Sequence, residues 1–486
     1  MQHPNPSLDE LTLVIDIGKS HAKLLMVDVD GTVVERHGRN NAPVVSPLGY
    51  PALDVHGLEA WMTQTLSASA RTRQCTKVIA ATHGAAFVAL AEDGLAWEPM
   101  DYEHDALAAA PDLIQAFVAI SDHFALTLSP DLPAGLNAAR QLFAMQNLYP
   151  EAWRRTRCLL PYPQYWAWLL SGVRASEYSS LGCHTHLWQP LRQDYSDLAH
   201  NNRWATLFAP LQPAWAPLGT VLPQMAQRWG LPPHCVVYTG VHDSNACLAR
   251  YLNADSRTGT NACRLTVVSS GTWTVLMAPG ASTAALQAER DMLANVDVLG
   301  RATPTARFMG GREFAYLLDG ASPQAGTLAD VTHLIATQTM ALPSFASQGG
   351  PFAWREGVVL RGDTPVALTD LPEGERAALA ALYCALVTGW LVRQLWPGAA
   401  GCERLVVEGP LSHNPLYMGL LSGLLPGVTC YASVDELEGT ARGAWQLTRW
   451  AQPVDATFLQ TTDPLDLPAL PAYALMWQQR VLPDFP

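Results

Sequence analysis

The sequence predicts an α/β protein built from two large domains, and three observations carry this prediction. The chain has 486 residues, which is too long for a single hydrophobic core and fits two domains. An apolar hairpin, Leu11–Gly31, opens the chain and is followed by alternating helical and strand-like segments. A second apolar hairpin, Leu265–Ala278, repeats the pattern of strand, small polar turn and strand, which indicates an internal duplication. We predict that the domains span residues 1–250 and 251–486.

The composition describes a well-buried globular protein and argues against several classes of partner. Hydrophobic residues make up 49% of the chain and charged residues 15%, which is not the composition of a disordered chain. The formal net charge of −13 argues against nucleic acid or an anionic membrane as the main partner. An anionic ligand would therefore need local positive groups and a metal. No run of about 18 uncharged apolar residues suggests a membrane span.

Cysteine usage and the N-terminal residues bear on the compartment. The nine cysteines are odd in number, scattered, and form no C-x-x-C pair, which favours free thiols in a reducing cytosol. The first residues are polar and lack a basic stretch before an apolar core, so we expect no signal peptide. We therefore expect a cytoplasmic protein. The sequence leaves the oligomeric state open, with a homodimer as one option.

The first half begins with strands rather than with a βαβ unit. After the opening hairpin, the pattern predicts a third strand at Thr32–Arg36, a helix at His56–Arg71 and a strand at Lys77–Ala81. This order differs from the βαβ repeat of a dinucleotide-binding sheet. Further along, we predict helices at Leu136–Leu148 and Tyr165–Leu170, and a short strand at Val236–Gly240.

The second half alternates helices and strands after its hairpin. A long amphipathic helix is predicted at Pro372–Leu395, with Thr369 or Asp370 as its cap. Gly439 and Gly443, in a predicted last helix, indicate a place where another element packs closely. The other predicted elements are a strand at Arg404–Val407, a helix from about Asn414, a strand at Val428–Tyr431 and that last helix at Glu436–Arg449.

The turn of the first hairpin has the residues that a metal–nucleotide phosphate site needs. Asp16 ends a buried strand, and the small turn Gly18–Ser20 brings backbone N–H groups close to phosphate oxygens. A P-loop is excluded, because Leu13 stands where its first glycine would be and a strand follows the turn. An ordinary hairpin turn with a surface aspartate is the alternative. Lys19 and Lys23, within reach of the turn, favour the phosphate site.

Two further segments carry candidate chemistry, each beside a simpler structural explanation. Gly271-Thr272 lies in the turn of the second hairpin, where a plain turn is an equally good reading. Its interest is that two such turns, facing each other, clamp a polyphosphate from both sides. Asp243 follows a short strand and a glycine, so it is either a helix cap or a carboxylate placed as the base for a substrate hydroxyl.

Other residues are explained by structure when each is taken alone. Glu408-Gly409-Pro410 is a strand-to-helix loop, with the alternative that it brings backbone close to a nucleotide. His83 is more simply a packed or surface histidine than a ligand. Arg307 and Arg312 are most simply surface charges around a turn.

Taken in order, these segments resemble the FGGY family of carbohydrate kinases, whose fold is α/β and actin-like, with two ribonuclease H-like domains and a cleft between them. Asp16–Lys23 is similar to the phosphate-1 motif D-x-G-x-[ST]-x-x-[RK], and Val268–Trp273 resembles the phosphate-2 motif. Gly240–Asp243 is similar to the segment that holds the catalytic aspartate. The S-S-G-T-W form of the second motif, together with Glu177–Ser180, resembles the L-rhamnulokinase and L-fuculokinase branch. The resemblance spans nearly the whole chain.

The resemblance implies ATP-dependent transfer of the γ-phosphoryl group to a primary hydroxyl of a sugar, most simply C1 of a ketose or deoxyketose such as L-rhamnulose or L-fuculose. It implies that Asp243 is the base and that Asp16 holds Mg²⁺ through water. The residues that it places on the nucleotide are Gly18, Lys19, Ser20, Lys23, Gly271, Thr272, Gly409 and Asn414. The residues that it places on the sugar are His83, Gly84, His242, Asp243 and Arg307.

Two alternatives stay open. The adenosine motif of the family has consecutive glycines, whereas this chain has Glu408-Gly409-Pro410, and a non-catalytic sugar or nucleotide sensor on the same fold would fit that change. The presence of Asp16, Asp243 and Thr272 together argues against a sensor, which has no need of a base. The other alternative is a kinase for a polyol such as glycerol, or for an aldose-derived acid.

Overall fold

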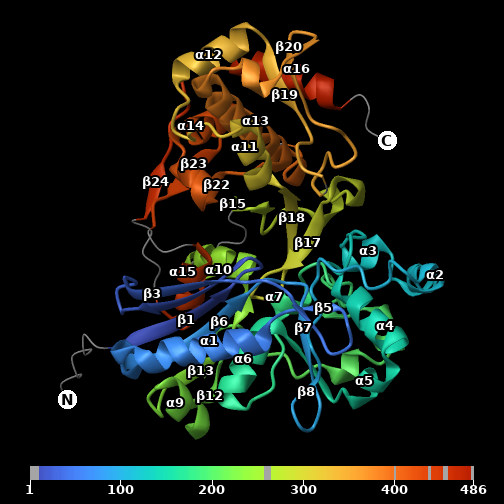
Figure 1. The fold of residues 1–486 in the computed structure, drawn as a ribbon. Coiled ribbons are helices and arrows are strands. Elements are labelled where there is room, and N and C mark those ends of the chain that lie inside the picture. The colour runs from blue at the N-terminus through green and yellow to red at the C-terminus, as the bar shows by residue number, and fades with distance from the viewer. Residues whose placement is uncertain are drawn as a thin grey trace. The chain divides into compact units, whose positions relative to one another are not determined.

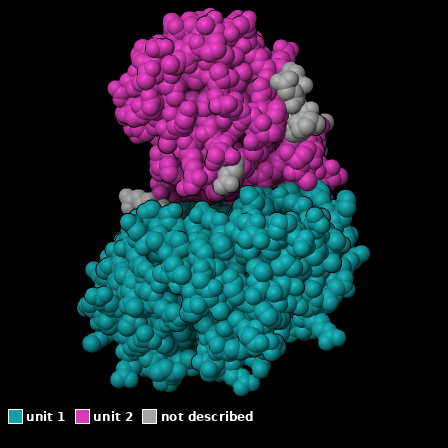
Figure 2. All heavy atoms as spheres, turned by 45° about the vertical axis from the view of Figure 1, so that its right-hand side comes forward, with its two compact units in different colours: residues 1–258, 294–302, 437–454 teal, residues 259–293, 303–436, 455–486 magenta. Residues whose placement is uncertain are grey.

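The structure, a computed structural model, describes residues 10–256, 264–347, 349–398, 401–435, 439–452 and 458–482 (Figure 1). The chain forms two compact units, which Figure 2 distinguishes by colour. Unit 1 comprises residues 1–258, 294–302 and 437–454, and unit 2 comprises residues 259–293, 303–436 and 455–486. The chain therefore passes between the units several times, and each unit is described by itself below.

Unit 1 is built on a sheet whose strands follow the order β12-β13-β6-β1-β2-β3. β1 is antiparallel to β2 and parallel to β6, and β6 is parallel to β13. The central position of β1 explains its sequence, since every residue of this strand is buried. The bounds are β12 (Pro217–Thr220), β13 (Val236–Tyr238), β6 (Cys75–Thr82), β1 (Leu11–Ile17), β2 (His21–Val27) and β3 (Val33–Asn40).

Unit 2 repeats this sheet. Its strands follow the order β24-β23-β22-β15-β16-β18, and each neighbouring pair has the same direction as its counterpart in unit 1. The second hairpin occupies the place of the first, which confirms the duplication that the sequence indicates. The bounds are β24 (Leu459–Thr461), β23 (Thr429–Ser433), β22 (Arg404–Glu408), β15 (Leu265–Ser270), β16 (Thr274–Met277) and β18 (Ala302–Phe308).

Helices cover both faces of the unit 1 sheet (Figure 1). One face packs into a core with α1 (Val55–Ala68), α6 (Tyr162–Ser171) and α9 (Pro223–Trp229). On the other side, α15 (Gly439–Leu447) contacts β1 and β6 and pairs with α10 (Asp243–Ser256). A second hydrophobic core includes residues of α4 (Ala138–Leu148). The presence of α4 confirms the helix predicted at residues 136–148.

α10 and α15 approach each other closely at Gly443. A Cβ atom added to Gly443 would lie 1.7 Å from the carbonyl oxygen of Ala246, so only glycine fits there. This confirms the close packing that the sequence predicts for this helix. Glu436, where the prediction begins the helix, lies outside the described residues.

Unit 2 is organised around one long buried helix, α13 (Glu373–Leu395), which packs against α11 (Gly310–Leu318) and α14 (Pro415–Leu424). By length and apolarity α13 could span a bilayer, but 89% of its apolar window is buried, as in the core helix of a globular domain. The predicted cap at Thr369 or Asp370 is wrong. Those residues form a 3₁₀ turn, Leu368–Asp370, and Pro372 is the N-cap, with φ of −55° and no side-chain hydrogen bond.

The remaining elements connect or flank these layers. The described cysteines are all free and buried, as expected for reduced thiols. The other strands are β4 (Val44–Val45), β5 (Pro51–Ala52), β7 (Phe87–Leu90), β8 (Leu95–Trp97), β9 (Cys158–Pro161), β10 (Trp188–Gln189), β11 (Asp194–Tyr195), β14 (Val241–His242), β17 (Leu293–Val296), β19 (Thr339–Leu342), β20 (Val358–Arg361) and β21 (Thr364–Pro365). The other α-helices are α2 (Pro111–Ile120), α3 (Phe124–Thr127), α5 (Pro150–Arg155), α7 (Tyr178–Leu181), α8 (Asp197–Asn201), α12 (Leu328–Ala336) and α16 (Leu470–Val481).

Candidate active site

The first hairpin turn is held on both sides by backbone and side-chain contacts. The Gly18 N–H donates to the carbonyl of His21 at 2.9 Å and closes the turn. Asn41, which follows β3, makes two further hydrogen bonds to the turn. Its backbone N–H donates to the Ser20 carbonyl and its side-chain amide donates to the Gly18 carbonyl, both at 2.8 Å. The turn at Gly18–Ser20 is therefore a rigid feature at the end of β1.

Asp16 is buried at the end of β1, with 8% of its surface exposed. The pleat places Asp16 on the opposite face from Ile15 and Ile17, which belong to the core under α1. Lys23 lies opposite Asp16 in the β1–β2 register, so the two side chains share a face. That face is the one that α15 contacts.

Lys19 pairs with carboxylates of unit 1. Its ammonium forms an ion pair with the buried Asp101, lies 3.7 Å from Glu103, and is 5.0 Å from the centre of the Tyr102 ring. Its charge is therefore balanced within unit 1, so the neutralisation of phosphate that the sequence suggests for Lys19 would require it to leave Asp101.

A small polar pocket lies beside this ion pair. It has about 300 Å³ of empty volume, including space open to solvent, and its lining combines donors and acceptors. The polar residues that line it are Lys19, Asn41, Asp54, His83, Asp101 and Tyr162. Such a lining offers hydrogen-bond donors and acceptors to a polar ligand.

His83 lines this pocket and is close enough to Asp243 to feel its charge. Its ring is buried, packs against Tyr102 and Tyr162 with centroids 5.3 Å away, and has Nδ1 2.9 Å from the Gly84 carbonyl oxygen. Burial lowers the pKa of His83, although the charges of Asp243 and Asp101 act in the opposite direction. Of the two simple readings, the structure supports a packed histidine rather than a surface one.

Asp243 is the first residue of α10, and the sheet places it beside the other candidates. β14 pairs in parallel with β6, with His242 opposite Thr82, so Asp243 follows a strand that ends level with β6 and its His83-Gly84 extension. The Asp243 Oδ1 lies 3.2 Å from His242 Nε2, and 29% of the Asp243 side chain is exposed. The carboxylate thus lies against a buried ring and is still reachable from solvent.

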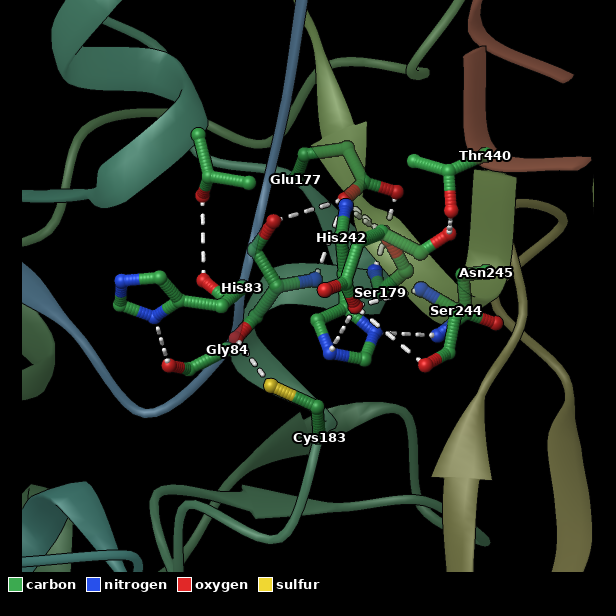
Figure 3. A network of polar contacts seen from close by, with 12 residues as sticks. His83, Gly84, Glu177, Ser179, Cys183, His242, Ser244, Asn245 and Thr440 are labelled. Atoms are coloured by element: carbon green, nitrogen blue, oxygen red, sulfur yellow. Dashed lines mark hydrogen bonds and ion pairs between the residues drawn. The ribbon is translucent and has the colours of Figure 1, made fainter. Parts of the chain in front are cut away.

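A buried polar network supports His242 from behind (Figure 3). The His242 backbone N–H donates to Ser179 Oγ at 3.3 Å, and that hydroxyl donates to Glu177 at 2.6 Å. Glu177 also accepts from the backbone N–H groups of Ser179 and Ser180. Burial raises the pKa of Glu177 to about 7, although these hydrogen bonds act in the opposite direction. Glu177 caps α7 and is a residue whose supporting role sequence reasoning missed.

Two other residues fix the chain around the site. A Cβ atom on Gly84 would lie 2.6 Å from Cys183 Sγ and 2.9 Å from His242 Nε2, so glycine is required beside the ring. Gln164, which sequence reasoning did not assign, donates from Nε2 to the carbonyls of Thr239 and Gly240 at 3.1 Å each. A carboxylate at position 164 has no N–H to give these carbonyls, which explains an amide here.

In unit 2, the turn of the second hairpin is exposed to solvent on one side and contacts the N-terminus of α11 on another. Gly271 and Thr272 are exposed, and the Gly271 N–H donates to the Trp273 carbonyl at 2.9 Å. A Cβ atom on Gly311, in the first turn of α11, would lie 2.1 Å from the Gly271 carbonyl oxygen. The N-terminus of α11 therefore packs on this turn, where its dipole favours an anion.

Gly409 is fixed by the same turn. Its φ is +82°, and a Cβ atom there would lie 2.0 Å from the Ser270 carbonyl oxygen. Ser270 links the two segments, since its hydroxyl donates to the Glu408 carbonyl and accepts from the Leu411 N–H. The loop after β22 thus contacts the end of β15. Unit 1 has the equivalent contact, because the His83 N–H, after β6, donates to the Ile17 carbonyl at the end of β1.

Arg307 and Asn414 have structural partners in unit 2. Arg307 is 7% exposed and makes a bidentate ion pair with Asp291 at 3.0–3.2 Å, with its guanidinium 4.7 Å from the Trp273 ring centre. The prediction that Arg307 is a surface charge is therefore wrong. The same prediction holds for Arg312, which is exposed. Asn414 is the N-cap of α14, with Oδ1 accepting the Tyr417 N–H at 3.0 Å, which accounts for its residue type.

The candidates thus gather at equivalent strand ends in each unit. Unit 1 holds those at the ends of β1, β6 and β14, and unit 2 holds those at the ends of β15 and β22. Among the described residues, no group of three or more His, Cys, Asp or Glu side chains forms a metal cage. Mg²⁺ fits the site in another way, because it is usually held by one or two carboxylates, water and substrate phosphates, and Asp16 is such a carboxylate.

Comparison with known proteins identifies the family. Residues 262–456 match the family model described as carbohydrate kinase FGGY, C-terminal domain. The crystal structure of a carbohydrate kinase from Novosphingobium aromaticivorans is 33% identical, with a TM-score of 0.83, and the match covers 96% of this chain and 100% of that one. The chain belongs to the FGGY family of carbohydrate kinases. This FGGY kinase is therefore a phosphotransferase with an alcohol group as acceptor, and its family uses ATP.

More distant structures share the fold of this kinase. A ligand-bound xylulose kinase from Lactobacillus acidophilus is 12% identical with a TM-score of 0.72, and the match covers 97% of this chain and 96% of that one. Plasmodium falciparum glycerol kinase with ADP is 10% identical with a TM-score of 0.71, covering 97% and 98%. At these identities the likeness concerns the fold, and it confirms the predicted two-domain α/β sugar kinase fold. No curated protein sequence matches the chain significantly.

Proposed function

We propose that this kinase transfers the γ-phosphoryl group of ATP to a primary hydroxyl of a ketose or deoxyketose, with Asp243 as the base. The observation that carries the proposal is the placement of Asp243. Its carboxylate is 29% exposed at the start of α10, and its Oδ1 lies 3.2 Å from the buried His242 Nε2. An accessible acceptor held in one orientation is what a general base needs.

The reaction at this carboxylate follows from phosphoryl-transfer chemistry. The acceptor oxygen forms a bond to the γ-phosphorus, the bond from that phosphorus to the β,γ-bridging oxygen breaks, and ADP leaves. The hydroxyl proton passes to the Asp243 carboxylate. Because the transition state is loose, alignment of the hydroxyl contributes more than the strength of the base. His242 and the buried network behind it supply this alignment.

Phosphate binding would fall to the two hairpin turns. In unit 1 we assign Gly18 and Ser20, with Lys23 on the same sheet face as Asp16. In unit 2 we assign Gly271 and Thr272, where the start of α11 adds its dipole. Asp16 would hold Mg²⁺ through water, and the ion would neutralise charge on the phosphate oxygens. Gly409 and Asn414 stay assigned to the nucleotide side.

The polar pocket beside His83 supports a polyhydroxylated acceptor. Lys19 and Asp101 offer a donor and an acceptor within one ion pair, and His83 lines the same pocket. One of the structures that share the fold is a xylulose kinase, which fits a ketose, and the S-S-G-T-W motif fits L-rhamnulose or L-fuculose. Gly84, His242 and Arg307 complete the proposed sugar side. We further propose a cytoplasmic location, and a homodimer as the state to test by light scattering.

An ADP-release assay with Mg²⁺–ATP tests the proposal. The acceptor panel is L-rhamnulose, L-fuculose, xylulose, gluconate and glycerol, and we expect a ketose to give the highest kcat/KM. Asp243→Asn should lower kcat by about 10²–10⁴-fold with KM for ATP nearly unchanged. Asp363→Asn is the control, because that carboxylate is 96% exposed in unit 2.

Each other outcome has a definite meaning. Near-normal turnover in Asp243→Asn would remove Asp243 from the role of base. Nucleotide binding without ADP release for any acceptor would favour the sensor. Preference for glycerol or gluconate would replace the ketose by a polyol or a sugar acid.

A further inference from the structure

We propose that Asn245 is a positioning residue that holds His242 in the Nε2–H tautomer, so that an N–H group, and not a lone pair, faces Asp243. The proposal rests on the proposed function only for its effect on turnover. The tautomer itself follows from the geometry of three neighbouring side chains at the start of α10.

The ring of His242 is contacted at both nitrogens. Nε2 lies 3.2 Å from Asp243 Oδ1. Nδ1 lies 3.1 Å from Asn245 Nδ2, and both of these residues are labelled in Figure 3. Asn245 is 0% exposed and His242 7% exposed, so water does not compete freely for either contact. The protonation of the ring is therefore decided by Asp243 and Asn245.

Only one assignment satisfies both contacts of a neutral ring. The Asn245 amide nitrogen is a donor, so Nδ1 accepts and Nε2 carries the hydrogen of the neutral ring; this places a positive N–H edge 3.2 Å from the negative Oδ1 of Asp243. Burial lowers the pKa of His242, which favours the neutral ring, although the Asp243 charge acts in the opposite direction. Nδ1 is then an acceptor, and the amide group of Asn245 must be the donor.

The opposite orientation of the Asn245 amide is unfavourable. It would turn Oδ1 toward Nδ1, which would then need the hydrogen, and a bare Nε2 lone pair would face the carboxylate of Asp243. In the present orientation Asn245 Oδ1 is buried and has no hydrogen-bond partner within the described part of the chain. In this orientation the amide donates its hydrogen to His242 Nδ1.

The ring lies close to its neighbours. A Cβ atom on Gly84 would be 2.9 Å from Nε2, and the His242 backbone N–H donates to Ser179 Oγ, as described above. The titratable groups close to His242 are Asp243, Cys183, Glu177 and His83, and burial raises the pKa of Cys183 to about 12, so its thiol stays protonated. Asp243 is thus the only one of these groups in ion-pair contact with the ring.

The consequence concerns the two oxygens of Asp243. Its described contacts, with His242 and with Ser244, use Oδ1. The positive N–H edge at Nε2 attracts that oxygen, which leaves the other oxygen for the acceptor hydroxyl. A ring in the other tautomer would repel Oδ1 and release this orientation.

Nitrogen NMR on the full chain tests the tautomer directly. In ¹⁵N-histidine-labelled protein, two-bond correlations distinguish the Nε2–H, Nδ1–H and doubly protonated rings, and His242→Gln assigns the signal. We expect the Nε2–H pattern in the wild type between pH 6.5 and about 8. Asn245→Asp should add the second N–H, because a carboxylate at this position only accepts. Asn245→Leu should lose the fixed pattern.

A matched control separates this effect from a loss of folding. Asn295→Leu replaces another buried asparagine of unit 1 whose Oδ1 lacks a partner, and it should leave the His242 signal unchanged. Thermal unfolding of all variants shows which of them are folded. A Nδ1–H or doubly protonated ring in the wild type would overturn the proposal, and so would an unchanged pattern in folded Asn245→Leu.

Turnover then tests the positioning role. With the best acceptor of the panel, Asn245→Leu should lower kcat by about tenfold or more, with a smaller change in KM. The expected tautomer with an unchanged kcat would overturn the positioning role and leave Asp243 as the base untouched. If no acceptor is phosphorylated, the proposed function fails, and the NMR result still decides the tautomer.

Discussion

Substitution of Gly443 by alanine is the sharpest test of how unit 1 is assembled. The added Cβ atom would lie 1.7 Å from the carbonyl oxygen of Ala246, about half of an ordinary carbon–oxygen contact of about 3.4 Å. Both neighbours belong to helix backbones, so neither is able to rotate away. α10 and α15 would have to separate by roughly 1.5 Å, or tilt by an equivalent amount.

The expected cost combines two opposing terms. Overpacking of this kind costs about 1–3 kcal/mol, and a clash with backbone belongs at the upper end. Replacing a helical glycine by alanine returns about 1 kcal/mol of helix propensity. We therefore expect Gly443→Ala to lower the free energy of unfolding by about 2 kcal/mol. Since α10 begins at Asp243, a shift of about 1 Å should also lower kcat by as much as about 10²-fold.

Urea denaturation with constant m-value measures the first effect, and the ADP-release assay measures the second. Gly389→Ala is the matched control, because a Cβ atom there would lie 3.5 Å from Leu424 Cβ, an ordinary contact within a buried helix. It should be neutral or stabilising by up to about 1 kcal/mol. If Gly443→Ala is as stable as Gly389→Ala, the close approach of α10 and α15 is not as described.

Two further predictions concern buried charges. Burial raises the pKa of Glu177 from 4.5 to about 7, so the folded state keeps a proton that the unfolded chain has released, and stability should fall as pH rises through this window. We compare the unfolding free energy of the wild type with that of Glu177→Gln, whose side chain does not titrate. The wild-type value minus the Glu177→Gln value should decrease by about 3 kcal/mol from pH 4.5 to 7. A difference that stays constant with pH in urea titrations would contradict this prediction. Arg307→Met leaves Asp291 buried without its ion-pair partner and should cost about 3–5 kcal/mol. A loss below about 1 kcal/mol by chemical denaturation would show that the pair does not stabilise unit 2.

Local patterns in the sequence were enough to predict both hairpins and the central strands of each sheet, but not β12, β18 or β24. β1 and β15 are apolar runs because they lie at the centre of their sheets, and small residues mark the turns that follow. The position of Asp243 was also predictable, since a short strand and Gly240 precede it. Gly240 has φ of +89°, which a residue with a side chain rarely adopts.

Contacts between distant segments were not predictable. Lys19 pairs with Asp101, 82 positions away, and no local pattern indicates which of many carboxylates it would meet. The support of His242 by Glu177 depends on the fold bringing α7 behind β14. The cap of α13 was missed because polar Thr369 and Asp370 are typical caps, whereas the 3₁₀ turn moves the start to Pro372.

Because α15 belongs to unit 1 but lies near the C-terminus, unit 1 is completed late during synthesis of the chain. All of unit 2 from residue 303 to 436 is synthesised before α15 emerges, so the α10 surface around Ala246 has no intramolecular cover until then. Domains usually mature in the order in which they are made. Here the first unit is completed almost last, and a chain stopped before residue 439 would lack part of unit 1 as well as the end of unit 2. Nascent chains of this kinase therefore acquire the helix pair that carries Asp243 only near the end of translation.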